Sequence, residues 1–169
     1  MPSVAAKNDV VDEMLRQWGR KKPHLDASGL GIVLRIVLLS GILEKRLEGV
    51  LAPASVAPWE FDVLAALRRA GGRRGLSPKQ LCESARLTSG AMTHRLDRLE
   101  ARGFVLRRAQ REDGRRVHVL LTPRGRALVD RVIGARMEEA AQSVAALPRQ
   151  ERKDLARLLR TLGLALDDA

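Results

Sequence analysis

Residues 87–108, LTSGAMTHRLDRLEARGFVLRR, decide the fold. Hydroxyl side chains at Thr88 and Ser89 are typical helix N-caps, and Gly103 is typical of the position just past a helix. We therefore predict a helix that begins after Thr88 or Ser89 and ends at Arg102. Its apolar residues recur at helical spacing and form one stripe: Met92, Leu96 and Leu99. That stripe predicts the buried face of the helix.

The face opposite this stripe is small and polar at its beginning, as a helix that approaches base edges requires. It carries Gly90, Thr93, His94, Asp97 and Ala101, with Arg98 at the flank. The hydroxyl groups at its start can also donate to phosphates near the helix N-terminus. We expect DNA contacts from Thr88, Ser89, Thr93, His94 and Arg98. The alternative for this segment alone is an ordinary solvated surface helix.

A basic β-hairpin is predicted directly after this helix. Residues 104–108 form a strand-like run, residues 110–114 a polar turn, and residues 117–121 a second run with strand alternation. Long cationic side chains at a hairpin tip can enter the minor groove, where the negative potential is focused. We expect DNA contacts from Arg111, Asp113, Arg115 and Arg116, with Asp113 orienting Arg115 by a charge-assisted hydrogen bond. The alternative is a solvated basic turn.

The flanking sequence predicts further helices at residues 10–20, 27–51, 59–70, 78–85, 123–146 and 148–166. A helix-turn-helix followed by a hairpin is the winged form of this motif, so the fold class is mainly α with a small β-hairpin wing. The apolar stretches 30–51 and 155–166 need a cover, which an isologous dimer provides.

These predictions divide the chain into functional parts. Residues 9–20 form an extra N-terminal helix, residues 27–52 and 123–169 form the dimerisation helices, and residues 58–122 form a winged helix-turn-helix DNA-binding domain. The fold is therefore expected to dimerise through its N- and C-terminal helices.

The composition favours a duplex as the partner. Lys and Arg number 31 against 20 Asp and Glu, which gives a net charge of +11, and a folded chain this basic favours a polyanion. Proteins that bind single strands stack bases on aromatic side chains. Only four aromatic residues occur here: Trp18, Trp59, Phe61 and Phe104.

Other function classes find little support in the sequence. A single cysteine, Cys82, rules out an internal disulfide or a thiolate zinc site within one chain, and we expect a buried inert thiol rather than a redox sensor. The three histidines lack metal-ligand spacing, and no nucleophile–base pair or phosphate loop occurs. We expect no cofactor and no enzymatic activity. No secretory signal or membrane span is apparent, so the expected location is the cytoplasm.

Residues 59–125 resemble the MarR (multiple antibiotic resistance regulator) family of transcription factors. The matching pieces are LTSGAMTHRLDRLEARGFVLRR and DGRRVHVLLTPRG, residues 113–125. The wing pattern of the family, Asp-x-Arg and then Leu-Thr-x-x-Gly, falls on Asp113, Arg115, Leu121, Thr122 and Gly125. Gly114 departs from the family, which usually has an arginine there. The resemblance implies a homodimer on a pseudo-palindromic operator, with recognition helices in major grooves and wings in the adjacent minor grooves.

Two side chains point to a small-molecule site. Asp62 lies among apolar residues of its helix, and a carboxylate there needs a partner. Arg95 lies beside the buried stripe of the recognition helix, so it is poorly aimed at bases. The two side chains could pair or could frame a pocket for an anion. The alternatives are a carboxylate favoured by the helix dipole at Asp62 and a phosphate contact at Arg95.

The extra helix and the run WEFDVLAALRRAG resemble the urate-responsive branch of the family. That resemblance implies a ligand site formed by Trp18, Asp62 and Arg95. In the implied mechanism an anion stacks on Trp18, bonds Arg95 and repels Asp62, which shifts the recognition helix and loosens DNA. The alternative role for Trp18 is that of a packing anchor.

The sequence thus predicts a sequence-specific double-stranded DNA-binding regulator, a repressor in its simplest form, released by a small anionic aromatic ligand such as urate. One alternative is an architectural duplex-binding protein without an effector, which would show strong salt dependence and little sequence preference. Another is a regulator that responds to phenolic or aromatic carboxylates. A helical dimer whose wing contacts a protein instead of DNA is a further alternative.

Overall fold

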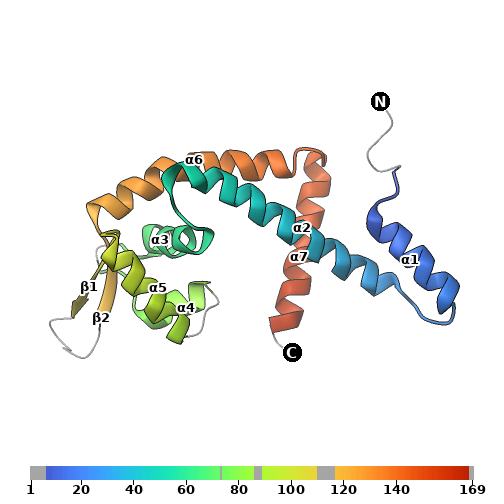
Figure 1. Cartoon of the computed structure of the whole chain (residues 1–169), viewed down its shortest axis with the longest axis horizontal. Helices are drawn as coiled ribbons and strands as arrows, with labels where there is room; N and C mark the ends of the chain where they lie inside the picture. Colours follow the sequence, from blue (N-terminus) through green and yellow to red (C-terminus); the bar gives the residue numbers. More distant parts are fainter. Residues whose placement is uncertain (1–6, 73, 86–88, 110–116, 168–169) are drawn as a thin grey trace. The chain divides into compact units, whose positions relative to one another are not determined.

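The structure is a computed structural model that describes residues 7–72, 74–85, 89–109 and 117–167 (Figure 1). The chain divides into two compact units, residues 1–44 with 139–169 and residues 45–138. The helices are α1 (Val10–Lys21), α2 (Ser28–Leu51), α3 (Pro58–Ala70), α4 (Pro78–Ala85), α5 (Ser89–Ala101), α6 (Pro123–Ser143) and α7 (Arg149–Asp167), with a short 3-10 turn η2 (Ala52–Ala54). The strands are β1 (Val105–Ala109) and β2 (Val117–Leu121).

This order confirms the predicted fold class, mainly helical with a small antiparallel hairpin. Several boundaries differ from prediction by one residue, and the end of α6 differs by three. The first strand begins at Val105 rather than Phe104, and α6 ends at Ser143 rather than Ala146. The one-residue difference at β1 is within the fraying expected at the ends of elements. After α6, residues 144–146 form a turn in which the Ala145 amide donates to the Gln142 carbonyl oxygen at 3.1 Å.

Local sequence signals explain where the helices of the second unit begin and end. Ser77 and Gln80 form a reciprocal capping pair before α4, with the Gln80 amide donating to Ser77 Oγ at 3.3 Å and the Ser77 amide donating to Gln80 Oε1 at 2.8 Å. Gly103 follows α5 with a positive φ of 71°, a conformation in which glycine avoids the Cβ strain. The start of α4 and the end of α5 therefore lie within one residue of the positions that these signals predict.

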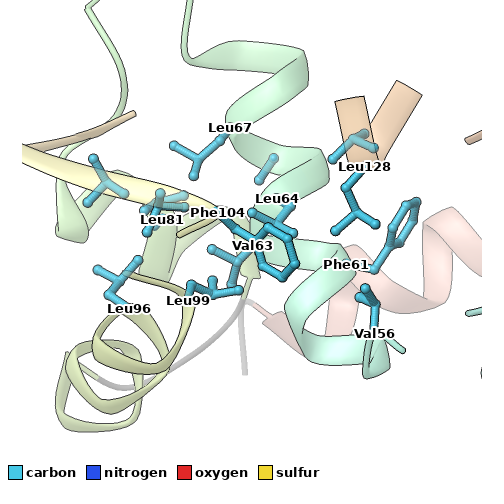
Figure 2. Packing of buried hydrophobic residues seen from close by; sticks show 14 of the residues in the cluster. Val56, Phe61, Val63, Leu64, Leu67, Leu81, Leu96, Leu99, Phe104 and Leu128 are labelled. Carbon is cyan, nitrogen blue, oxygen red and sulfur yellow. The ribbon is translucent and has the colours of Figure 1, made fainter. Parts of the chain in front are cut away.

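One hydrophobic core holds the second unit together. Buried side chains from α3, α4, α5, both strands and α6 belong to a single cluster, in which Leu64, Leu81 and Leu99 are fully inaccessible. Figure 2 shows this cluster, with labelled side chains of α3 facing those of α5 and Leu128 of α6. Each fully buried leucine contributes about 1.5–3 kcal/mol relative to exposure, so this core fixes α5 against α3.

A further backbone connection joins the segment before α4 to the hairpin. Leu76 pairs with Val119 of β2 in an isolated antiparallel bridge, with N···O distances of 3.0 and 2.8 Å. The adjacent Gly75 has a φ of 74°, and a Cβ there would lie 2.2 Å from the Val119 carbonyl oxygen. This bridge could not be predicted from the sequence, because a single residue pair carries no periodicity.

In the first unit, α1 packs on α2. Arg35 of α2 donates to both carboxylate oxygens of Asp9 at 2.8 and 3.0 Å and to Asp12 at 2.6 Å. The Arg35 contact is the main reason that the pKa of Asp9 lies below its ordinary value. Leu15 lies directly over Gly31, where a Cβ would approach its side chain to 2.9 Å. The extra N-terminal helix is thus attached to α2 by charge and by packing.

Much of the apolar surface of this unit remains exposed. Its exposed apolar side chains include Ile32, Val33, Val37, Leu39 and Ile42 on α2, and Leu158, Leu159, Leu164 and Leu166 on α7. These are the stretches for which the sequence predicted a cover. Among the described residues, no helix has the length and apolar character needed to cross a membrane.

Candidate nucleic-acid interface and effector site

Helix α5 presents the two faces that the sequence predicted. Met92, Leu96 and Leu99 are buried, with at most 1% of their surface accessible. The opposite face is exposed and carries Thr93, His94, Asp97, Arg98 and Ala101. Thr88 and the side chain of Ser89 lie outside the described residues, so their expected phosphate contacts remain predictions. The short polar side chains at Thr93 and His94 leave the beginning of the helix open to approach by a base edge.

The base of the hairpin is tied to this helix by Arg107 of β1. Its guanidinium contacts Asp97 at 2.7 Å and Glu100 at 2.7 Å, and its backbone amide donates to Glu100 at 3.0 Å. Partial burial lowers the pKa of Arg107, but the hydrogen bonds with Asp97 and then Glu100 outweigh that effect and leave the pKa raised. Arg107 thus joins α5 to the wing, a role that could not be predicted from the sequence.

The predicted tip of the wing, with Arg111, Asp113, Arg115 and Arg116, lies outside the described residues. The strands that carry it are confirmed, paired from Val105 with Leu121 to Ala109 with Val117. The tip contacts with the minor groove therefore remain predictions.

The corner after the wing explains part of the family-like pattern in physical terms. Thr122 Oγ1 lies 2.7 Å from the Gly103 carbonyl oxygen and accepts a hydrogen bond from the Gly125 amide at 3.0 Å, so Thr122 caps α6. A Cβ on Gly125 would lie 2.1 Å from the Phe104 carbonyl oxygen. Glycine is required there because the start of α6 passes directly over the beginning of β1.

Arg95 lies against an aromatic ring that the sequence analysis left out of the site. The guanidinium carbons of Arg95 and Arg98 lie 5.2 and 5.1 Å from the centre of the Trp59 ring, within cation–π range. Arg95 is half-buried and Arg98 is exposed. The predicted inward lean of Arg95 is therefore present, and Trp59 of α3 is the side chain that receives it.

The placement of Asp62 differs from the expected apolar surroundings, because its side chain is exposed in the single chain. Neighbouring atoms still desolvate its carboxylate, which raises the pKa of Asp62, while the positive charges of Arg136 and Arg95 oppose that rise. Asp62 and Arg95 therefore lie close enough to interact electrostatically, and the ligand site that they were expected to form remains a prediction. Arg136 of α6 is a third charge in this cluster that the sequence analysis did not include.

Trp18 lies on α1, in the unit that does not contain Asp62 and Arg95, and 52% of its surface is exposed. Its participation in a shared site with Asp62 and Arg95 remains a prediction.

An ion pair between buried Glu60 of α3 and partly exposed Arg102, which directly follows α5, also joins these elements. Glu60 is 2% exposed; it accepts from Arg102 at 2.6 Å and from the Ala57 amide at 2.9 Å. Arg102 also donates to the Ser55 carbonyl oxygen at 2.8 Å. Trp59 and Glu60 are adjacent in the first turn of α3. Through them α3 contacts Arg95 and Arg98 of α5 and also Arg102, which directly follows α5. The contact between Glu60 and Arg102 could not be predicted from helical periodicity, since the sequence shows Glu60 only as a carboxylate in the first turn of a helix.

The described residues contain no group of three or more His, Cys, Asp or Glu side chains suited to a metal ion. Cys82 is half-buried beside the core rather than fully buried as expected. Neither observation adds a catalytic group to the surface formed by α5 and the hairpin.

Comparison with known proteins agrees with this geometry. A model described as MarR family matches residues 55–116. The HTH-type transcriptional regulator PecS of Dickeya dadantii is 30% identical over 149 residues, which cover 88% of this chain and 90% of PecS.

Solved structures of similar fold include a mutant MarR of E. coli complexed with operator DNA. It has a TM-score of 0.69 and 25% identity, with 92% of this chain and 99% of that chain covered. Another is Bordetella bronchiseptica BpsR, from a structure on regulation of its DNA binding by 6-hydroxynicotinic acid, with a TM-score of 0.69 and 23% identity over 83% of this chain and 97% of that chain. On the extent of its similarity to these regulators and on its winged helix-turn-helix, the chain belongs to the MarR family of transcriptional regulators.

Proposed function

We propose that the protein is a homodimeric transcriptional repressor that reads a pseudo-palindromic operator in double-stranded DNA. The observation that carries this proposal is the exposed polar face of α5. This helix is held by its buried stripe of Met92, Leu96 and Leu99 and by the contacts of Arg107 with Asp97 and Glu100. A net charge of +11 supplies the sequence-independent attraction to phosphates. The E. coli MarR structure, which holds operator DNA, supports the same use of the fold here.

Exposed apolar side chains on α2 and α7 support the dimer. A monomer rarely leaves so many large aliphatic side chains in water, and a patch of this kind typically marks a protein interface. In this proposal residues 27–52 and 123–169 dimerise and residues 58–122 bind DNA. The mass of one chain is 18.6 kDa, and sedimentation velocity should give a single species with twice that mass. A monomer at micromolar concentration would contradict the dimer.

The proposed effector is a small anionic aromatic molecule, with urate as the first candidate. The cluster of Asp62, Arg95 and Arg136 supports this, because an arriving anion is attracted by two guanidinium groups and repelled by one carboxylate. An anion that draws Arg95 toward itself removes one of the two cations from Trp59 and so perturbs α5 at its contact with α3. Trp18 supplies an exposed ring for stacking. Coupling between two such sites typically amounts to about 1–3 kcal/mol.

A phenolic or aromatic carboxylate is the second candidate effector. The related BpsR structure concerns regulation of that protein's DNA binding by 6-hydroxynicotinic acid, which supports testing this class. The same charge cluster would receive its carboxylate.

Fluorescence anisotropy tests the proposal on the intergenic DNA upstream of the protein's own gene, beside a scrambled duplex at the same salt concentration. Preferential binding that urate reverses supports both the repressor and its effector. Preferential binding that is reversed only by an aromatic carboxylate supports the repressor and indicates that this carboxylate, rather than urate, is the effector. Equal binding to both duplexes contradicts sequence-specific regulation at this DNA and favours the architectural alternative.

A further inference from the structure

A hollow of about 410 Å³ lies in the DNA-binding unit, between η2, the end of α5, the start of β1 and the first turns of α6. Its lining includes Ser55, Arg102, Phe104, Arg124 and Arg131. The volume falls within the range of about 300–1,000 Å³ that is usual for small-molecule sites. It shares no lining residue with the cluster of Asp62, Arg95 and Arg136.

The lining is strongly positive. Three of its side chains are arginines, and no acidic residue lines it among the residues that the structure describes. Arg102 is paired with Glu60 at 2.6 Å. Within the same described part of the chain, Arg124 and Arg131 have no carboxylate partner. The hollow therefore holds more positive charge than the protein itself neutralises.

Two of these arginines are held in place before any ligand arrives. The guanidinium carbons of Arg102 and Arg124 lie 4.8 and 5.1 Å from the centre of the Phe104 ring. Arg102 is fixed further by its hydrogen bond to the Ser55 carbonyl oxygen at 2.8 Å. A guanidinium that is already oriented loses less entropy when it binds an anion.

We propose that this hollow is a second ligand site, which binds the phosphate group of a small phosphorylated molecule. A carboxylate carries one charge and engages one guanidinium fork, whereas a phosphate offers three acceptor oxygens and up to two charges to several arginines. The hollow is larger than a phosphate group alone, so it also has room for the organic part of the ligand.

Ligand binding in the hollow would affect α5 through Arg102. That side chain holds Glu60 of α3 from the end of α5, and the second oxygen of Glu60, Oε1, is buried without a hydrogen bond. A phosphate bound at Arg102 therefore shares a guanidinium with the ion pair that joins α3 to α5. Binding there adds stability to the folded unit by mass action.

Isothermal titration calorimetry with inorganic pyrophosphate as the probe tests this site, on the full chain without DNA and at constant ionic strength. The test variant is Arg124→Ala/Arg131→Ala, which leaves the Arg102–Glu60 pair intact. The matched control is Arg149→Ala/Arg160→Ala, which removes the same charge from exposed positions of α7. Circular dichroism confirms that each variant is folded.

We expect saturable binding that weakens at least about tenfold in the test variant and less than about twofold in the control. If Arg124→Ala destabilises the fold, Arg131→Ala alone should still weaken binding, since Arg131 makes no described contact that the fold requires. Equal weakening in test and control variants would overturn the site, because net charge would then explain the affinity. Weakening only in Arg115→Ala/Arg116→Ala would assign the anion to the wing and also overturn it. Because no DNA or urate is present, either result leaves the repressor proposal untouched.

Discussion

Two glycines of α6 allow matched substitutions with opposite expected effects on stability. At Gly125, a Cβ would lie 2.1 Å from the Phe104 carbonyl oxygen, 3.0 Å from its carbonyl carbon and 3.2 Å from the Leu121 side chain. At Gly134, no heavy atom outside the helix lies within 4 Å. The two positions share a helix and differ in the space around the added methyl group.

For Gly125→Ala, the carbonyl of Phe104 cannot move freely, because it accepts a hydrogen bond from the Thr122 amide at 3.0 Å and lies 3.2 Å from the Thr122 hydroxyl. The corner must open, and overpacking of this kind costs about 1–3 kcal/mol. Gly134→Ala should instead raise the free energy of unfolding by about 0.5–1 kcal/mol, since alanine loses less conformational entropy in a helix.

Urea denaturation followed by circular dichroism measures both variants, with the protomer concentration fixed because a dimer's stability depends on it. We expect their free energies of unfolding to differ by about 1.5–4 kcal/mol, with opposite signs relative to the unmodified protein. A Gly125→Ala protein as stable as the Gly134→Ala protein would refute the close approach of α6 to β1.

Three further substitutions test the DNA-binding surface and the charge cluster. Arg115→Ala should weaken DNA binding and reduce the slope of log affinity against log salt by about one, because a wing cation is lost; an unchanged slope in a salt titration would count against the wing. Trp59→Leu should lower the free energy of unfolding by about 1–2 kcal/mol, because two cation–π contacts of roughly 0.5–1 kcal/mol each disappear. Trp59→Phe keeps an aromatic ring with weaker cation–π contacts, so urea denaturation would disprove this reasoning if Trp59→Phe were less stable than Trp59→Leu. The pKa of Asp62 is raised on folding, so its contribution to stability is fully present below its ordinary pKa of 3.8 and is lost as pH rises through the folded pKa. Asp62→Asn should therefore raise the melting temperature slightly at pH 7 and not below pH 3.8, and thermal melts showing the reverse order would contradict the assigned cause.

The elements of the fold follow from local signals in the sequence. Ser77, Pro78 and Gly103 mark ends that the structure reproduces, because capping depends on neighbouring residues alone. The stripe of Met92, Leu96 and Leu99 identified the buried face of α5, since helical periodicity is also local.

The contacts between elements were harder to predict. The position of Arg95 predicted its inward lean, but only the folded chain shows that Trp59, 36 positions earlier in the numbering, receives it. The burial of Glu60 depends on Arg102, and the Leu76 bridge depends on the turn at Gly75. These pairings arise from tertiary packing, which no periodic pattern in a single segment encodes.

The most direct test of the central claim is a hydroxyl-radical footprint of the protein on the DNA upstream of its own gene. A dimer that inserts one α5 helix into each of two major grooves should protect two similar half-sites, with centres about one helical turn or a small multiple apart. The protection should persist with excess scrambled competitor and should fade in a His94→Ala/Thr93→Ala protein. Uniform protection without half-sites, unaffected by that double substitution, would contradict sequence reading by α5.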